Sequence, residues 1–472
     1  MPTQTQTQTQ TQTQTQNPLL QGNSFLEREA EILQKYQEQA ELEVIKELQD
    51  ALESLYLLAQ LKQYANSHGL RFVGYRSVSI LLSSGNSFEV KTPVFHQRMP
   101  FDRRRKHYRS KTLFHLGLEY FGLSARCSPL LLKRILPLAA LCPSFEVAAQ
   151  MAKCFGIELY QRLLREKFNH FAQQAMQMRE DGLVDQEYQQ AGIRLVISID
   201  GGRIRTRKTR RGKKKQGAKR QGYKTDWREP YLITITLFDE QGNRLKNVQT
   251  LCDGIFDGDL DDAFELLKTY LLQMNLEQAQ EIVFCADKGK GLWPRIDALI
   301  ESLHIPQAKR IVDYTHAKQN LNSIINIIKQ AIKPKAKELK KIASKLKNWL
   351  YQGNIEQIEN YLNTLLRYKR SKAKALKKIR DYFADPTQFQ YEQYRNLGVP
   401  IGSGIVESAI RRVINLRIKA PGMFWHRDNA EKMIFMRAQI LTGRWDQICK
   451  HTFNKLALQV QNICATPLQK AA

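Results

Sequence analysis

From residue 193 onward, apolar segments follow one another in an order that few folds use. Runs of about four to eight apolar residues predict buried strands, and apolar residues at three-four spacing predict helices. Three strands come first, and then helices and strands alternate. The expected strands are 193–200, 231–238, 245–252, 281–286 and 310–313, and the expected helices are 260–274, 293–303 and one that begins at 315.

This order, β-β-β-α-β-α-β-α, is that of an RNase H-like core. The segment that follows, 318–394, has a helical pattern and many basic residues, which indicates a helical insertion. Gly402-Ser403-Gly404 then opens a last pair of helices. The expected fold class is a multidomain α+β protein, in which an RNase H-like α/β catalytic core carries an all-helical insertion and follows a helical and β-hairpin N-terminal DNA-binding region.

The N-terminal region begins with seven Thr-Gln repeats, a polar tract that is expected to be disordered. Segment 25–64 has the pattern of one long amphipathic helix, which either packs on a core or contacts a second subunit. Segment 73–97 alternates like a β-hairpin. Segment 143–170 predicts two short helices that meet at Gly156. That is the size of a helix-turn-helix, but ordinary helix pairs also look like this.

Composition shifts divide the chain into seven expected parts. These are a Thr-Gln tract (1–24), the amphipathic helix (25–64), a DNA-binding region (65–190), the first part of the core (191–317), the basic helical insertion (318–398), the second part of the core (399–450) and a C-terminal tail (451–472).

The net charge of +27 indicates a polyanionic partner, and nucleic acid is the most economical one. Segment 203–224 holds 12 basic residues and no acid, and segment 333–380 holds 15 basic residues against three acids. Clustered cations of this kind bind phosphate backbones by releasing counterions. A solvated face or an acidic protein partner is the alternative. The candidate DNA-binding residues are Arg203, Arg205, Arg207, Lys208, Arg210, Arg211, Lys213, Lys214 and Lys215.

The cysteines and the apolar segments bear on the compartment. Seven cysteines without a Cys-x-x-Cys pair argue against a disulfide framework or a zinc site, and they fit a reducing compartment. The N-terminus has no signal-peptide pattern. The most apolar stretch, 130–142, is short and contains Lys133 and Arg134, so no membrane span is expected. The expected location is the cytoplasm, and the nucleoid when DNA is bound.

Three carboxylates fall where such a core would gather them. Asp200 ends the first strand, Asp287 follows the fourth, and Glu407 begins a late helix. Clustered carboxylates repel one another unless they share cations, and hard oxygen ligands favour Mg²⁺ or Mn²⁺. Two such ions promote in-line displacement at phosphorus. Taken singly, each acid also fits an ordinary turn or helix start.

Several motifs together resemble the DDE transposases of bacterial insertion sequences, closest to the ISKra type within the Mutator-like superfamily. The motifs are Ser198-Ile199-Asp200-Gly201-Gly202, Trp227-Arg228-Glu229-Pro230, Asp313-x-x-His316, Gly402-Ser403-Gly404-x-x-Glu407-Ser408 and Pro421-Gly422-Met423-x-Trp425. The resemblance covers about 193–446. It implies that Asp200, Asp287 and Glu407 are a catalytic triad that binds two Mg²⁺ or Mn²⁺ ions. The implied reaction is DNA cleavage and strand transfer, by cut-and-paste or copy-out transposition.

Two interpretations remain open for each of the other candidate site residues. Asp313 and His316 are either accessory site residues or a helix cap. Arg411 and Arg412 either hold phosphate or face solvent, and Trp425 either stacks on an unpaired base or packs in the core. The expected partners are double-stranded DNA, as terminal inverted repeats and target, and a second copy in a homodimer on DNA. A non-catalytic DNA-binding protein, decayed or domesticated, and a structure-selective nuclease are the rival functions.

Overall fold

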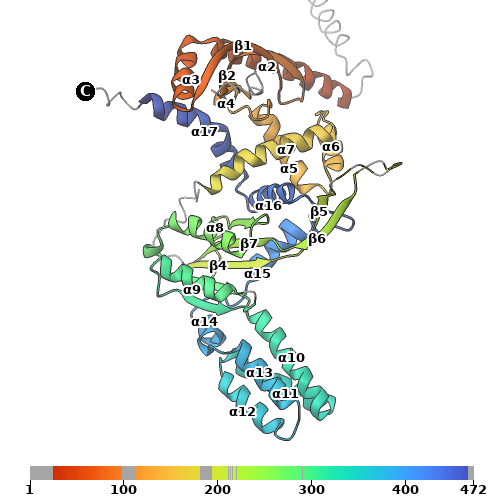
Figure 1. Cartoon of the computed structure of the whole chain (residues 1–472), viewed down its shortest axis with the longest axis vertical. Coiled ribbons are helices and arrows are strands. Elements are labelled where there is room, and N and C mark those ends of the chain that lie inside the picture. Colours follow the sequence, from red (N-terminus) through yellow and green to blue (C-terminus); the bar gives the residue numbers. More distant parts are fainter. Residues whose placement is uncertain are drawn as a thin grey trace, which may run out of the picture. The chain divides into compact units, whose positions relative to one another are not determined.

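The computed structural model describes residues 25–97, 112–180, 194–289 without 211, 213, 215, 219 and 220, and 291–465. The Thr-Gln tract lies outside the described residues. The chain forms two compact units, Met1–Phe171 with Cys449–Ala472, and Ala172–Ile448 (Figure 1). Both units combine helices with β-sheet, so the expected α+β multidomain class is confirmed. Within the described ranges, no helix has the length and apolar character that a bilayer span needs.

The first unit is a three-stranded sheet, in the order β1-β2-β3, with helices. The predicted hairpin is confirmed, with β1 and β2 paired antiparallel. The elements of this unit are α2 (Phe25–Glu53), α3 (Leu55–Ser67), β1 (Leu70–Leu81), β2 (Ser87–Gln97), β3 (Leu113–Phe114), α4 (Leu116–Tyr120), α5 (Pro129–Leu141), α6 (Phe145–Cys154), and most of α7 (Gln161–Ala175) and α17 (Trp445–Ala465).

The structure differs from the expected segments in two places. The helix expected over 25–64 is interrupted at Ser54, which has extended backbone angles (φ −61°, ψ 126°). Segment 451–472, expected as a tail, is helical as far as Ala465. Its Val460 is fully buried in a cluster with residues of α3, because Leu456, Val460 and Ile463 recur at helical spacing on one face.

The predicted helix pair of 143–170 is present as α6 and α7. The hydroxyl of Ser144 accepts a hydrogen bond from Val147 N (3.1 Å) and so caps α6. After α6 the chain turns at Gly156 in the left-handed region (φ 74°), where glycine carries no steric cost. The arrangement matches the sequence prediction, and its use in DNA binding stays a prediction.

The second unit is built on a five-stranded mixed sheet in the order β10-β9-β4-β7-β8. β4 pairs antiparallel with β7 and parallel with β9, β7 pairs antiparallel with β8, and β9 pairs parallel with β10. The strands are β4 (Arg194–Gly201), β7 (Tyr231–Phe238), β8 (Leu251–Ile255), β9 (Glu281–Ala286) and β10 (Lys309–Val312). Most of their residues are buried, as in a sheet covered on both faces.

Two features of the second unit were not predicted. The third strand was expected at 245–252, but β8 begins only at Leu251 and includes Asp253 and Gly254. Asp and Gly are poor strand formers, which is why the pattern failed there. The basic segment after β4 forms a two-stranded antiparallel ribbon, β5 (Ile204–Thr209) with β6 (Tyr223–Arg228). Its mainly polar residues give no apolar run, so the sequence pattern did not predict these strands.

Helices follow the strands as expected. Asp259 and Asp262 form a capping box at the start of α8. The predicted helical insertion corresponds to the end of α10 and to α11–α14. The helical elements of this unit are α8 (Leu260–Leu272), α9 (Leu292–Ser302), α10 (Tyr314–Ile332), α11 (Ala336–Tyr351), α12 (Ile355–Leu365), α13 (Lys372–Tyr382), α14 (Tyr391–Asn396), α15 (Gly404–Ala409), the π-helical segment Ile410–Asn415 and α16 (Arg427–Leu441).

Candidate active site

Three aspartates lie level with one another at the ends of three adjacent parallel strands. β4 pairs with β9 as Arg194↔Glu281, an offset of 87 residues, and the same offset relates Asp200 to Asp287. β9 pairs with β10 as Ala286↔Val312, so the next residues, Asp287 and Asp313, are also level. The backbone N–H of Asp313 still bonds to Ala286 O at 3.0 Å. The register of the sheet therefore brings these carboxylates to one edge.

Asp200 and Asp287 line the same small pocket, together with Gly201, Gly289, Tyr231 and Leu292. Asp200 Oδ1 accepts a hydrogen bond from Gly201 N at 2.7 Å, and Asp287 Oδ1 accepts one from Lys288 N at 2.6 Å. Both carboxylates are partly exposed to this pocket. The structure thus brings together two of the three predicted acids, and it does so through strand register.

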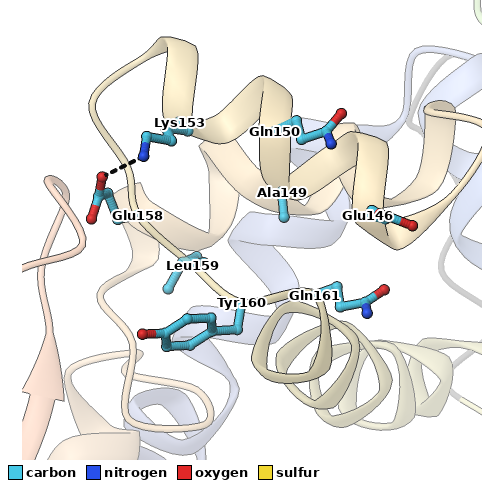
Figure 2. Close-up of a pocket in the computed structure, with 8 residues that line it drawn as sticks. All are labelled: Glu146, Ala149, Gln150, Lys153, Glu158, Leu159, Tyr160 and Gln161. Carbon is cyan, nitrogen blue, oxygen red and sulfur yellow. Dashed lines mark ion pairs between the residues drawn. The ribbon is translucent and has the colours of Figure 1, made fainter.

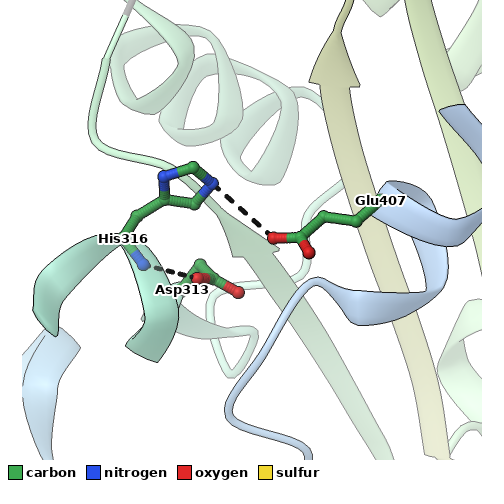
Figure 3. Close-up of side chains that lie close together, drawn as sticks. All are labelled: Asp313, His316 and Glu407. Atoms are coloured by element: carbon green, nitrogen blue, oxygen red, sulfur yellow. Dashed lines mark hydrogen bonds and ion pairs between the residues drawn. The ribbon is translucent and has the colours of Figure 1, made fainter. Parts of the chain in front are cut away.

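His316 connects the third acid to the other two. Its Nδ1 lies 3.8 Å from Asp287 Oδ2 and its Nε2 lies 3.8 Å from Glu407 Oε1. One imidazole therefore stands between the carboxylates of Asp287 and Glu407, and Figure 3 shows its contact with Glu407. Glu407 lies in α15, which follows the helical insertion, and its side chain is 44% exposed. An exposed carboxylate at this position is accessible to a cation or a substrate.

Asp313 holds the two helices that carry His316 and Glu407. Its Oδ1 accepts a hydrogen bond from His316 N at 2.8 Å and so caps α10. Its Oδ2 accepts hydrogen bonds from the backbone N–H and the hydroxyl of Ser403, the residue before α15. Asp313 is 1% exposed. The capping reading of Asp313 is therefore confirmed, and the same carboxylate also fixes the start of the helix that carries Glu407.

Asp313, His316 and Glu407 form a group that could hold a metal ion. Each offers one ligand atom, and these atoms all lie within 4.8 Å of one another (Figure 3). Two carboxylates and an imidazole suit several divalent metals, so the donor set does not select one. The group shares Glu407 with the predicted triad and replaces Asp200 and Asp287 by Asp313 and His316.

The electrostatics of the site favour a cation. Burial raises the pKa of the Cys285 thiol, and the negative charges of Asp313 and Glu407 raise it further. Cys285 lies in β9, two residues before Asp287, and the smaller, electrostatic part of its pKa shift comes from carboxylates near this edge of the sheet. A bound divalent cation would offset the repulsion among these carboxylates.

Tyr382 is a site residue that sequence reasoning missed. It ends α13 of the helical insertion, and its hydroxyl donates a hydrogen bond to Asp287 Oδ1 at 3.1 Å. Burial raises the pKa of Tyr382, and the charge of Asp287 raises it further, so the hydroxyl stays a donor at neutral pH. The two residues are 95 positions apart, and no local pattern in the sequence connects them.

The predicted DNA-binding residues lie mostly on the surface. Arg211, Lys213 and Lys215 are outside the described residues. Arg203, Lys208, Arg210, Lys214, Arg411 and Arg412 are exposed, and Arg205 and Arg207 are half-buried. Arg411 and Arg412 lie in the π-helical segment that follows α15, a backbone form that often occurs at functional sites.

Trp425 lies between the π-helical segment and α16, and it attaches the ribbon of β5 and β6 to that part of the chain. Its backbone pairs with the ribbon, because Arg207 N donates to Trp425 O at 2.9 Å and Trp425 N donates to Arg205 O at 3.1 Å. Its indole N–H donates to Ile418 O at 3.0 Å, and Arg417 lies 5.3 Å from its ring. These contacts give Trp425 an anchoring role, and base stacking by Trp425 stays a prediction.

A second pocket lies in the predicted helix-turn-helix, between α6 and the start of α7 (Figure 2). Lys153 and Glu158 form an ion pair across its edge at 3.1 Å, and both side chains are more than 70% exposed. Tyr160 is 84% exposed. The lining includes two glutamates, Glu146 and Glu158, and neither histidine nor cysteine.

The chain was compared with protein-family models and with curated proteins, and neither comparison finds a match. Two features of the second unit point to a function: its basic surfaces and the carboxylate edge, by which we mean the strand ends with Asp200, Asp287 and Asp313.

Proposed function

We propose that the protein is a DDE transposase of an insertion sequence, similar to the ISKra type, which cleaves DNA strands and transfers them. The observation that carries the proposal is the level row of Asp200, Asp287 and Asp313 at the ends of adjacent parallel strands, with Glu407 reached through His316. The strand order β10-β9-β4-β7-β8, in which β7 alone runs opposite to the other four strands, supports the RNase H-like assignment.

The donor set fits the metal that the proposal requires. Asp200 and Asp287 border one pocket, and Glu407 offers a partly exposed carboxylate on the other side of His316 from Asp287. Three carboxylates suit Mg²⁺ or Mn²⁺, which prefer oxygen ligands. When bound, two such ions would activate the attacking hydroxyl or water and stabilise the leaving oxygen.

The chain's own residues would hold and orient this site. Tyr382 fixes one oxygen of Asp287 through its hydrogen bond and leaves the other facing His316. Asp313 fixes the starts of α10 and α15, so His316 and Glu407 keep their spacing. Exposed Arg203, three positions after Asp200, directly precedes the ribbon, and it would neutralise DNA phosphates beside the site together with exposed Lys208.

The proposal is tested by strand cleavage and joining with Mg²⁺ or Mn²⁺ on labelled DNA that carries the ends flanking the coding sequence. Asp200→Ala and Glu407→Ala should abolish both steps, whereas Glu356→Gln, an exposed acid of the helical insertion, should leave them unchanged. Cleavage without joining would indicate a nuclease. DNA binding without cleavage in the unaltered protein would indicate a non-catalytic DNA-binding protein.

A further inference from the structure

One face of the ribbon gathers aromatic and cationic side chains. Alternate residues of a strand lie on the same face, so the cross-strand pairs Arg205–Trp227, Arg207–Thr225 and Thr209–Tyr223 share a face. Phe424, from the segment that Trp425 anchors, joins it. The Phe424 ring lies 4.7 Å from the Arg205 guanidinium and 5.6 Å from the Tyr223 ring. We call Arg205, Arg207, Tyr223, Trp227 and Phe424 the stacking face.

The stacking face is open to a ligand. Trp227 is 52% exposed and Tyr223 is 42% exposed. Arg205 lies over the Trp227 ring at 5.8 Å, within the range of a cation–π contact. A negatively charged ligand with a flat apolar surface would cover these rings and pair with Arg205.

The ribbon is held in place before any ligand arrives. The backbone bonds between Arg207 and Trp425, and the indole bond of Trp425, attach it to the segment after α15. At its base, Gly202 N donates to Pro230 O at 3.1 Å. A surface that is already ordered loses little entropy on binding, which favours a true binding site.

The opposite face of the ribbon carries three basic residues, Lys208, Lys224 and Arg228, and one acid, Asp226, and this net positive charge favours a polyanionic ligand. Lys208 and Lys224 are directly opposed across the two strands, and both are exposed. Like charges in this position destabilise a strand pair. A phosphate backbone bound along the ribbon would remove that repulsion. The two faces together combine a cationic track with aromatic rings, the combination that binds single-stranded nucleic acid.

We propose that the stacking face binds unpaired bases of single-stranded DNA beside the carboxylate edge, while Lys208 and Lys224 contact the phosphates. The choice of DNA as the nucleic acid rests on the proposed function. Base faces are covered in a duplex and free in a single strand, so Trp227 and Tyr223 would select unpaired DNA. The site would then hold a frayed or displaced strand next to Asp200.

The test is the affinity of the full-length protein, without divalent metal, for a labelled single strand and for the matching duplex. Trp227→Leu with Tyr223→Leu should weaken single-strand binding by roughly fivefold or more and change duplex binding less than about twofold. Trp227→Phe alone, which keeps an aromatic ring, should retain most of the affinity of the unaltered protein for the single strand. Lys208→Ala with Lys224→Ala, the matched control on the opposite face, should weaken both complexes and flatten their salt dependence.

Equal loss of both complexes in the aromatic variant, with unchanged thermal unfolding, would overturn the proposal. So would unaltered single-strand binding, or displacement of the single strand by polyglutamate at equal charge. Because no metal is present, these results do not depend on cleavage. A failed strand-transfer assay would overturn the proposed function. The binding measurements alone would still decide whether the stacking face selects single strands.

Discussion

The carboxylate of Asp313 holds Ser403, a residue ninety positions later in the chain, through both the backbone N–H and the hydroxyl of the serine. Its other oxygen caps α10. A single buried side chain therefore sets the positions of the two helices that deliver His316 and Glu407, and the whole helical insertion lies between the two partners in sequence.

Replacing Asp313 should destabilise the protein as well as inactivate it. Asp313→Ala removes a helix cap, which costs about 1 kcal/mol, and leaves the Ser403 donors unpaired, at about 1–3 kcal/mol more. Ser403→Ala should cost only about 1 kcal/mol. Chemical denaturation of both variants and of the double variant measures their coupling. Additive losses would contradict the direct contact.

Tyr382→Phe should weaken the proposed reaction without unfolding the protein. The change removes one hydrogen bond to Asp287, worth about 0.5–1.5 kcal/mol, so the metal concentration for half-maximal cleavage should rise roughly two- to tenfold. Tyr394→Phe is the matched control, because its hydroxyl donates to Thr387 O, also within the insertion, at 2.7 Å. Equal effects of the two changes would argue against a positioning role for Tyr382.

Metal titration separates the two possible ligand sets. Mn²⁺ at about 100 times its dissociation constant should stabilise the folded protein by about 2.7 kcal/mol, visible as a rise in Tm. Asp200→Asn should remove most of this rise and His316→Gln should not, if the three carboxylates bind the ion. The reverse result would assign the ion to Asp313, His316 and Glu407.

Arg179 should be needed for the stability of the second unit. It forms two hydrogen bonds with buried Asp253, at 2.7 and 2.8 Å, and also pairs with Glu431. Arg179→Met leaves both acids without their cation, and we expect a loss of about 3–5 kcal/mol in unfolding free energy. Arg162→Met, at an exposed ion pair, should cost less than about 1 kcal/mol by the same denaturation measurement.

His115 should make the first unit less stable in mild acid. Burial lowers the pKa of His115, and the charges of Arg126 and Arg76 lower it further. The unfolded chain, with an ordinary pKa near 6.5, then binds more protons below about pH 6.5 than the folded protein does, so stability falls as the pH drops. His115→Leu should reduce this loss between pH 7 and 5. An unchanged slope of Tm against pH would contradict the expectation.

The sequence predicted the carboxylate edge better than its surroundings. Asp200 and Asp287 each follow an apolar run, and that local pattern was enough to place both at strand ends. Asp253 interrupts β8 with a buried charge, so the same reasoning misplaced that strand. Its burial depends on Arg179, which lies 74 positions earlier, and no local pattern reveals such a pairing.

The sequence did not predict the ribbon or the role of Tyr382, because both depend on contacts between residues that are far apart in the chain. β5 and β6 contain mostly polar residues and are stabilised by pairing with each other and with the Trp425 segment, which periodicity does not register. Tyr382 belongs to a helix whose own pattern is explained by packing within the insertion. Only the folded structure shows that the last residue of that helix, Tyr382, donates a hydrogen bond to Asp287.

The helical insertion leaves the sheet and returns to it at nearly the same point. Tyr314 N, at the start of α10, donates a hydrogen bond to Ile401 O at 3.0 Å, where the chain comes back from α14. Loop-closure entropy changes slowly with length, so evolution could lengthen or shorten such a module at small cost to the sheet. The hydrogen bond from Tyr382 to Asp287 restricts that freedom: a module of any size must still return one hydroxyl to the same carboxylate.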